Sequence, residues 1–378
     1  MNAGEVGARI SLRSIARYLA IAGILSGAMA TRGEAGGNTN RRMLYVLDTN
    51  RGAVDGQVVL IDASTGKIDR TYATGYRPDM ALSLDGSRLY ISSRRGNGVN
   101  SSKSMLEVYD TASGTMIDAV DNPDSFQTTT TIYKSRMAIS SSGRYIYMLK
   151  LHNARDGTDE YIAAFDTLQR RFLRDHISLN TECDFVMLPT SEELTLDVAC
   201  ADSSNLREMT LSDGTAPVKD RILPIKTNGP KEKWGAVFLQ PGERNVALVS
   251  ASGSAFAVER VSAAAQRLGT AAQSGPWIQR GLMTESRSEV YFSTGTGHRS
   301  YPDGQDTIVG VDQMTLSLQR SLRTAHPFFS MELSRDGNTL YAVDPEQAAI
   351  TVVDAASFRE VTRLVPIGHT PCFAIAAP

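Results

Sequence analysis

A short strand pattern that ends at a tyrosine, or at an apolar residue in its place, occurs seven times along the chain. Two copies are the clearest: residues 80–90 read MALSLDGSRLY and residues 331–341 read MELSRDGNTLY. Each copy predicts a strand, a tight Asp-Gly turn and a second, antiparallel strand. The copies recur roughly every 50 residues, and such a period built from four-strand units is typical of a β-propeller. We therefore expect an all-β, seven-bladed β-propeller with four-stranded blades.

The other copies of the pattern are more degenerate. They lie at residues 137–147, 185–198, 237–249 and 282–291, and residues 43–48 keep only the second strand of a unit. The last apolar run, residues 372–376, has no partner of its own. Placing this run as the missing inner strand of the first unit closes the ring and removes open sheet edges, which invite aggregation. We predict one propeller domain over residues 43–378, with its ring closed by the C-terminal strand.

The first 30 residues have the pattern of a secretory signal peptide. Arg9, Arg13 and Arg17 precede an apolar run, and Ala28-Met29-Ala30 has the small-residue spacing of a cleavage site. A membrane anchor is the weaker alternative, because about a dozen apolar residues are too few to cross the hydrocarbon layer. We therefore expect export to the periplasm, with residues 31–42 forming a flexible lead-in.

Charge and cysteine content narrow the function classes. The formal net charge is −2, and no basic cluster suggests binding to nucleic acid or to an anionic membrane. Of the three cysteines, Cys183 and Cys200 are placed side by side across a predicted hairpin, which is the geometry that a disulfide needs. A reactive thiol pair is the alternative. Cys372 is left over and is interpreted as a small buried residue.

The predicted blades place the polar insertions on one end of the ring, which we call the loop face. The loops after each second strand and the segments that join blades both lie there, and the tight Asp-Gly and Ser-Gly turns lie on the opposite turn face. Loops are expected, among other places, at residues 151–160, 223–235 and 323–327, and all five histidines and both tryptophans lie in such segments. The candidate residues for contact with a partner or substrate are His152, Arg155, Trp234, Trp277, His298, Arg299, Tyr301, Asp303, His326 and His369. The alternative for each of them is a solvated loop position.

No motif on the chain assigns catalytic or metal-binding residues. The histidines lack the His-x-His or His-Glu-x-x-His spacing of a metal site, and no nucleophile-elbow sequence occurs. A hydrolase or lactonase with calcium in the central channel needs converging oxygen ligands at the starts of the inner strands. Asp79, Asp184 and Gln279 are near such positions, which is too few. We therefore assign no catalytic residue and no metal ligand.

Three stretches resemble a known family. Residues 182–190 (ECDFVMLPT) with 197–202 (DVACAD) are similar to a disulfide-bridged hairpin of the heavy (β) subunit of quinoprotein amine dehydrogenases, within the YVTN-type propellers. A second stretch runs from residues 276–279 (PWIQ) through 288–292 to 309–312, and a third is the closing IGHTP of residues 367–371. The family's longer N-terminal arm is nearly absent here.

The resemblance implies a periplasmic hetero-oligomer that oxidatively deaminates primary amines. In it, a small subunit carries a tryptophan-derived quinone, and electrons leave to a copper protein or a cytochrome. The heavy subunit holds no cofactor, docks the small subunit and helps to wall the substrate path. The quinone is not expected in this chain, because the quinone-bearing subunit is small and disulfide-dense whereas this chain has three cysteines.

Two function classes remain open from the sequence. The chain is either the non-catalytic heavy-chain-like subunit of an amine dehydrogenase or a free-standing periplasmic propeller that binds a protein or a small ligand. A neighbouring open reading frame for a short, cysteine-rich, tryptophan-containing exported protein favours the first class.

Overall fold

The structure is a computed structural model, and Arg41–Pro378 form one compact unit in it. It describes residues 42–49, 55–95, 103–122, 137–140, 142–154, 157–178, 184–189, 194–199, 205–211, 217–224, 234–240, 245–250, 253–259, 265–270, 279–283, 288–294 and 305–378. The predicted signal peptide and residues 31–41 of the predicted lead-in lie outside these residues; Arg42 is described and donates a hydrogen bond to Thr339 Oγ1 at 2.6 Å. In the described part of the chain every regular element is a strand, and no helix is long and apolar enough to cross a membrane.

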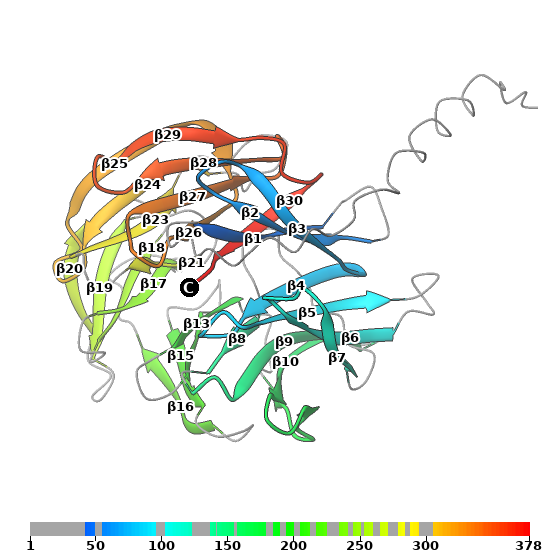
Figure 1. Cartoon of the computed structure of the whole chain (residues 1–378). Helices are drawn as coiled ribbons and strands as arrows, with labels where there is room; N and C mark the ends of the chain where they lie inside the picture. The colour runs from blue at the N-terminus through cyan, green and yellow to red at the C-terminus, as the bar shows by residue number, and fades with distance from the viewer. Residues whose placement is uncertain are drawn as a thin grey trace, which may run out of the picture. The chain divides into compact units, whose positions relative to one another are not determined.

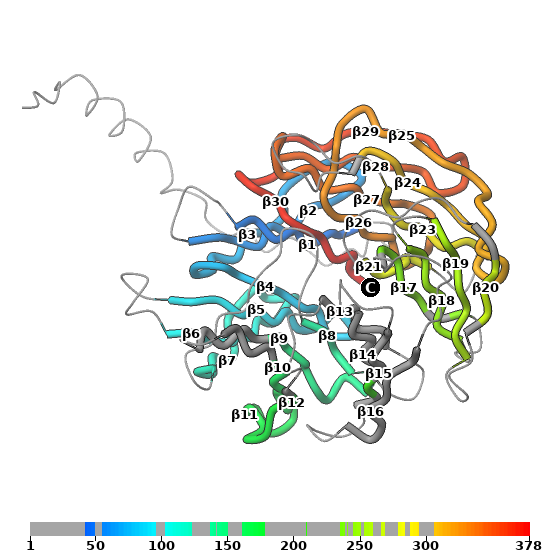
Figure 2. The backbone as a smooth tube through the Cα atoms, turned by 180° about the vertical axis from the view of Figure 1, so that it is seen from behind, coloured from blue at the N-terminus to red at the C-terminus, as the bar shows by residue number. Residues whose placement is uncertain are grey.

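The described strands form seven sheets, numbered here in chain order from the first, and Figures 1 and 2 show them following one another around a common centre. Sheet 1 contains, from the inside outward, β30 (Pro371–Ala376), β1 (Met43–Asp48), β2 (Gln57–Asp62) and β3 (Lys67–Ala73). Sheet 2 contains β4 (Tyr76–Leu82), β5 (Arg88–Arg95), β6 (Lys103–Asp110) and β7 (Met116–Asp121). Sheet 3 contains β8 (Met137–Ile139), β9 (Tyr145–Ala154), β10 (Gly157–Asp166) and β11 (Arg171–Phe172), and β12 (Ile177–Ser178) also pairs with β10.

The other four sheets repeat the four-stranded order. Sheet 4 contains β13 (Asp184–Pro189), β14 (Leu194–Ala199), β15 (Asn205–Leu211) and β16 (Pro217–Pro224). Sheet 5 contains β17 (Trp234–Leu239), β18 (Asn245–Ser250), β19 (Ser254–Glu259) and β20 (Ala265–Thr270), and β21 (Gln279–Arg280) runs parallel to β17. Sheet 6 contains β22 (Leu282–Met283), β23 (Glu289–Thr294), β24 (Gln305–Asp312) and β25 (Leu318–Phe328). Sheet 7 contains β26 (Ser330–Leu333), β27 (Thr339–Asp344), β28 (Ala349–Asp354) and β29 (Arg359–Leu364).

Burial on both faces explains the composition of the middle strands. Five consecutive residues of β1 and four of β2 are buried, whereas β3, β7 and β29 at the outer edges are mostly exposed. A strand with a packed sheet on each side needs apolar residues at successive positions, not only at alternate ones. The middle strands are therefore continuous runs of Val, Ile, Leu and Tyr.

The apolar clusters show that neighbouring sheets pack face to face. One cluster joins sheets 1 and 2, another joins sheets 2 and 3, and others join sheets 5 and 6 and sheets 6 and 7. A further cluster contains Leu44 and Val46 of β1 together with Tyr341 and Val343 of β27, so sheet 7 also packs against sheet 1. This arrangement is a β-propeller of four-stranded blades, as the repeat predicts.

The predicted closure by the C-terminal strand is confirmed. β30 pairs with β1 in an antiparallel register in which Leu44 faces Ala376 and Leu47 faces Phe373. The hairpins predicted from the repeat are also present: Met80 pairs with Ile91, and Phe185 pairs with Val198. Local alternation and turn chemistry are therefore enough to define these hairpins.

Several predicted loops are wrong, because the strands run further than expected. β9 extends to Ala154 and β10 begins at Gly157, so most of the loop predicted at residues 151–160 is a paired hairpin. The loop predicted at residues 323–327 lies within β25, and the end of the one at 223–235 lies in β17, which begins at Trp234. The backbone makes the ladder hydrogen bonds, so a strand can continue through polar residues after its apolar pattern has ended.

Candidate functional site

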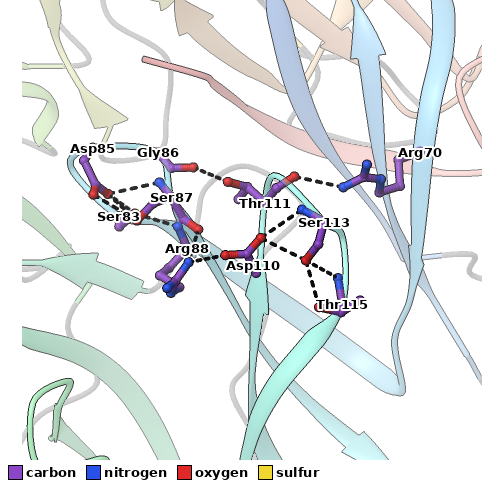
Figure 3. Close-up of polar contacts among 10 residues, drawn as sticks. All are labelled: Arg70, Ser83, Asp85, Gly86, Ser87, Arg88, Asp110, Thr111, Ser113 and Thr115. Carbon is purple, nitrogen blue, oxygen red and sulfur yellow. Dashed lines mark hydrogen bonds and ion pairs between the residues drawn. The ribbon is translucent and has the colours of Figure 1, made fainter. Parts of the chain in front are cut away.

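The turn face is made of tight turns whose polar groups bind one another, as Figure 3 shows for sheet 2. Asp85 Oδ1 accepts hydrogen bonds from Ser83 Oγ at 2.6 Å and from the Ser87 backbone N–H at 3.0 Å. These bonds, with the one from Ser83 Oγ the largest contribution, lower the pKa of Asp85 to about 2. Asp110 in the same way accepts from the backbone and side chain of Ser113 and from Arg88. These groups stabilise the turns themselves.

A residue of the neighbouring sheet also belongs to this turn network. Arg70 on β3 donates a hydrogen bond to the Thr111 carbonyl oxygen at 2.8 Å, and Thr111 Oγ1 donates to the Gly86 carbonyl at 2.7 Å (Figure 3). The network therefore connects sheet 1 to sheet 2 at the turn face.

On the loop face, the strands that follow the tight turns end in buried polar residues. Asp48 ends β1 and Asp344 ends β27, each three positions after the tyrosine of its strand, and both side chains are almost fully buried. Ser93, Ser250 and Ser293 are buried near the ends of β5, β18 and β23. Buried polar groups need hydrogen-bond partners, so each of these positions constrains the segments around it.

Asp48 holds the segment that connects sheet 7 to the closing strand. Its Oδ2 accepts hydrogen bonds from the His369 backbone N–H at 2.8 Å and from Gln57 Nε2 at 2.8 Å, and its Oδ1 accepts from the Thr370 backbone N–H at 2.7 Å. Gly368 has a φ of 64°, and a Cβ on it would lie 2.2 Å from Asp48 Oδ2. The Gly-His-Thr-Pro motif therefore has a structural role: its glycine admits the carboxylate and its backbone binds it.

Asp344 has the equivalent place in sheet 7. Its Oδ1 accepts from the backbone N–H groups of Glu346 and Gln347, and Arg363 Nη2 donates to its Oδ2 at 2.8 Å. Burial raises the pKa of Asp344, against the lowering by these hydrogen bonds and by Arg363. His326 at the end of β25 is exposed and lies close enough to interact electrostatically with this carboxylate. His326, one of the candidate contact residues, therefore lies near the buried carboxylate of Asp344.

A row of buried polar side chains crosses sheet 2 at its loop-face end. Asp79 on β4 pairs in register with Ser92 on β5, and Asn122 Nδ2 donates to Ser104 Oγ at 2.6 Å and approaches Ser92 Oγ at 3.4 Å. All four residues are more than nine-tenths buried. Asn122 Oδ1 is a buried acceptor with no hydrogen-bond partner among the described residues. An apolar cluster joins sheets 2 and 3, and by strand alternation this row lies on the same face of sheet 2 as that cluster.

The other face of sheet 2 carries a buried ion pair. Glu107 is 2% exposed and forms a two-point contact with Arg95, which also donates to the Ala73 carbonyl at 2.9 Å. Tyr109 OH donates to Glu107 Oε2 at 3.2 Å, and burial raises the pKa of Tyr109 to about 12. A paired, hydrogen-bonded carboxylate of this kind positions the ends of β3 and β5.

The structure describes only four of the predicted site residues. His326 and His369 are exposed on the loop face, and His152 and Trp234 lie in β9 and β17 and not in loops. The other candidates lie outside the described residues: Arg155, Trp277, His298, Arg299, Tyr301 and Asp303. In the described part of the chain, no group of three or more His, Cys, Asp or Glu residues is placed to bind a metal ion.

Sequence reasoning missed the buried carboxylates on the loop face. The signal was present, because Asp48 and Asp344 both stand three residues after the strand tyrosine of their repeats. An acidic residue at the end of an apolar run is also common in an exposed turn, so its burial follows only from the packing of neighbouring sheets.

Comparisons with known proteins agree with the fold. No protein-family model matches the chain, and no curated protein matches its sequence. A functionally unknown protein from Desulfotomaculum acetoxidans DSM 771 is similar over 88% of this chain and 99% of its own, with a TM-score of 0.62 and 13% identity. AztD from Citrobacter koseri covers 89% of this chain and 97% of its own, with a TM-score of 0.52 and 13% identity.

A third similar structure is the dihydro-heme d1 dehydrogenase NirN in complex with DHE. It covers 93% of this chain and 78% of its own, with a TM-score of 0.53 and 17% identity. At such low identities the likenesses show the β-propeller fold alone.

Proposed function

We propose that this protein is a non-catalytic propeller subunit that binds a partner through its loop face. The observation that carries the proposal is the difference between the two faces. The turn face consists of short turns that satisfy their own polar groups, whereas on the loop face Asp48 anchors the segment that joins sheet 7 to the closing strand. A rigidly anchored face with variable segments is how scaffold folds present binding surfaces.

The ionisable groups described on the loop face support a platform role. Asp48 and Asp344 accept backbone hydrogen bonds, and Glu107 is paired with Arg95. Carboxylates committed to backbone and guanidinium groups hold geometry, and they are not arranged as an acid–base pair around a shared reaction centre.

We propose that the partner is a small quinone-bearing subunit. The complex of the two subunits would oxidise primary amines. The support is the resemblance of three stretches to amine dehydrogenase heavy subunits, including IGHTP at residues 367–371. In this proposal the tryptophan-derived quinone belongs to the partner, and a copper protein or a cytochrome accepts the electrons. Export through the N-terminal segment would place the assembly in the periplasm.

Two further features of the chain belong to this proposal. Asp184 faces Ala199 across β13 and β14, so the next positions outward are those of Cys183 and Cys200, which lie outside the described residues. This register supports the proposed disulfide between them. We also propose that each of the seven sheets is one blade, which accounts for the packing of sheet 7 against sheet 1.

Affinity purification of the tagged protein from the periplasm of its native host tests the partner. Mass spectrometry and a visible absorption spectrum of the purified sample are the readouts. We expect a small co-purifying subunit with a quinone chromophore and a mature N-terminus after Ala30. A colourless propeller without a partner contradicts the amine dehydrogenase proposal and leaves the free-standing binding protein as the alternative.

Two surface variants test whether the partner binds to the loop face. Charge reversal by Arg299→Glu with Asp303→Lys, in the segment predicted for the loop face, should weaken partner binding at least tenfold. Arg335→Glu is the matched control, because Arg335 is exposed in the turn between β26 and β27. Equal losses of affinity in the two proteins would show that the loop face is not the binding surface.

A further inference from the structure

One innermost strand carries a glutamate where two equivalent strands carry alanine. Residues 80–83 read MALS, residues 137–140 read MAIS, and residues 331–334 read MELS. The alanines of the first two copies lie in β4 and β8, and both pack within or against apolar clusters between sheets. Glu332 therefore places a carboxyl where these two repeats have only a methyl group.

Glu332 lies where sheet 7 contacts sheet 1, beside the strand β30 that closes the ring. Its register partner across β26 and β27 is Tyr341, which belongs to the apolar cluster between sheets 7 and 1. Directly opposed residues of an antiparallel pair point to the same face of the sheet, so Glu332 faces sheet 1. β26 contacts the closing strand β30 there, and the backbone of Ala376 on β30 is among the groups that influence the Glu332 carboxyl.

Among the described residues, few charges face this carboxyl. Arg280 on β21 interacts with it electrostatically, and Tyr341 is the ionisable neighbour on β27. The strands β30 (PCFAIA) and β22 (LM) carry no acidic or basic side chain. Glu332 keeps some solvent-accessible surface, but the surrounding protein desolvates its carboxyl and raises its pKa to about 7, against the lowering by Arg280 and Ala376.

We propose that Glu332 is a proton-operated latch on the seam between β26 and β30. The neutral carboxyl is compatible with the closed seam. The ionised carboxylate favours opening of the seam, because separation of the two strands returns the charge to water. Protonation therefore strengthens ring closure, and loss of the proton near neutral pH weakens it.

The direction of the pH effect on the seam follows from the linkage between proton binding and closure. In the open state Glu332 has an ordinary carboxyl pKa, whereas in the closed state its pKa is raised, so the closed state binds the proton more tightly. The seam is most stable below the open-state pKa and loses stability as pH rises towards the closed-state value. Between pH 5 and pH 8 the opening equilibrium constant should rise on the order of 10²-fold.

Hydrogen exchange of the full-length protein tests the latch. Exchange of a peptide covering Pro371–Ala376 is followed between pH 5 and pH 8 in the wild type, Glu332→Gln and Glu332→Ala, each compared at the same pH so that intrinsic exchange rates cancel. Glu332→Ala restores the residue of the equivalent repeats, and Glu332→Gln preserves the shape if the alanine variant folds poorly. Asp69→Asn, an exposed acid on β3, is the control.

We expect opening of β30 to increase with pH in the wild type and in Asp69→Asn, and to stay flat in both Glu332 variants. A pH dependence that persists in the Glu332 variants overturns the proposal. So does a wild-type protein whose β30 opening is independent of pH.

Discussion

At the scale of single residues, the closing segment depends on one carboxylate and one glycine. Asp48 binds three donors from two distant parts of the chain, and Gly368 leaves room for its Oδ2. A positive φ is unfavourable for a residue with a side chain, and here the close approach of the carboxylate adds a second constraint. Both effects make this position specific for glycine.

Gly368→Ala should lower the free energy of unfolding by about 2–4 kcal/mol, because the left-handed backbone is strained and the new Cβ displaces a hydrogen-bonded carboxylate. Ala348→Gly is the control. It makes the reverse substitution in a loop that contacts the segment of Gly368. Ala348 has a φ of 48°, so glycine there should be neutral or stabilising by up to about 1 kcal/mol. Urea denaturation of the two variants measures both changes, and similar losses in the two would contradict this account.

At the scale of elements, an outer-strand arginine connects two pairs of neighbouring sheets. Arg70 stands eight residues after Asp62, and Arg320 stands eight residues after Asp312. Arg70 donates to the turn of sheet 2, and Arg320 donates to the Ala356 carbonyl in the turn of sheet 7 at 2.7 Å. The same position of the repeat is therefore used at two contacts between sheets.

Arg320→Met should cost about 1–3 kcal/mol of unfolding free energy, because it removes the bond to Ala356, the ion pair with Glu289 and the contact with the Phe358 ring. Arg323→Met is the matched control on β25. The Arg323 side chain is 80% exposed, so its pair with Asp306 should be worth less than about 1 kcal/mol. A double-mutant cycle with Glu289→Gln should show coupling for Arg320, and additive effects would argue against the ion pair.

The proposed disulfide belongs to the hairpin of β13 and β14. Cys183→Ala with Cys200→Ala should lower the free energy of unfolding by about 3 kcal/mol, since the bridge closes a short loop in the unfolded chain. Thermal unfolding of the double variant and of the wild type, each with and without reductant, measures the effect. Free thiols at both cysteines in the exported wild type, or an unchanged melting temperature, would rule the bridge out.

At the scale of the whole molecule, stability depends on joining the two ends of the chain. β30 supplies the inner strand of a sheet whose other strands come from the N-terminal part, and its Cys372 and Phe373 are buried against sheets 1 and 2. Without β30, the edge of β1 and the apolar surface beneath it would be open. Closure therefore affects the complete ring and not one sheet alone.

Deletion of residues 371–378 should abolish cooperative unfolding and lead to soluble oligomers, because the exposed edge of β1 pairs with other chains. Size-exclusion chromatography and the thermal melt followed by circular dichroism measure the outcome. Deletion of Pro378 alone removes no strand and is the control. A truncated protein that remains monomeric and melts cooperatively would show that the closing strand is dispensable.

Much of the fold could be predicted because its signals are local. The Asp-Gly turn of residues 80–90 and the apolar runs beside it define a hairpin whichever sheets surround it, and the unpaired run at residues 372–376 identifies the closing strand. The ends of the strands could not be predicted as well. β9 and β25 continue through polar residues, and this depends on the partner strand that is available.

The sequence by itself determined the strand class, the hairpins and the pairing of the two termini, because turn residues and apolar periodicity act over a few neighbouring residues. Only the tertiary structure decided which polar residues meet. Asp48 and His369 are 321 positions apart, and Glu332 on β26 meets the closing strand β30, which belongs to another sheet. Burial and hydrogen bonding at these sites are produced by contacts between distant segments, and a one-dimensional pattern does not contain them.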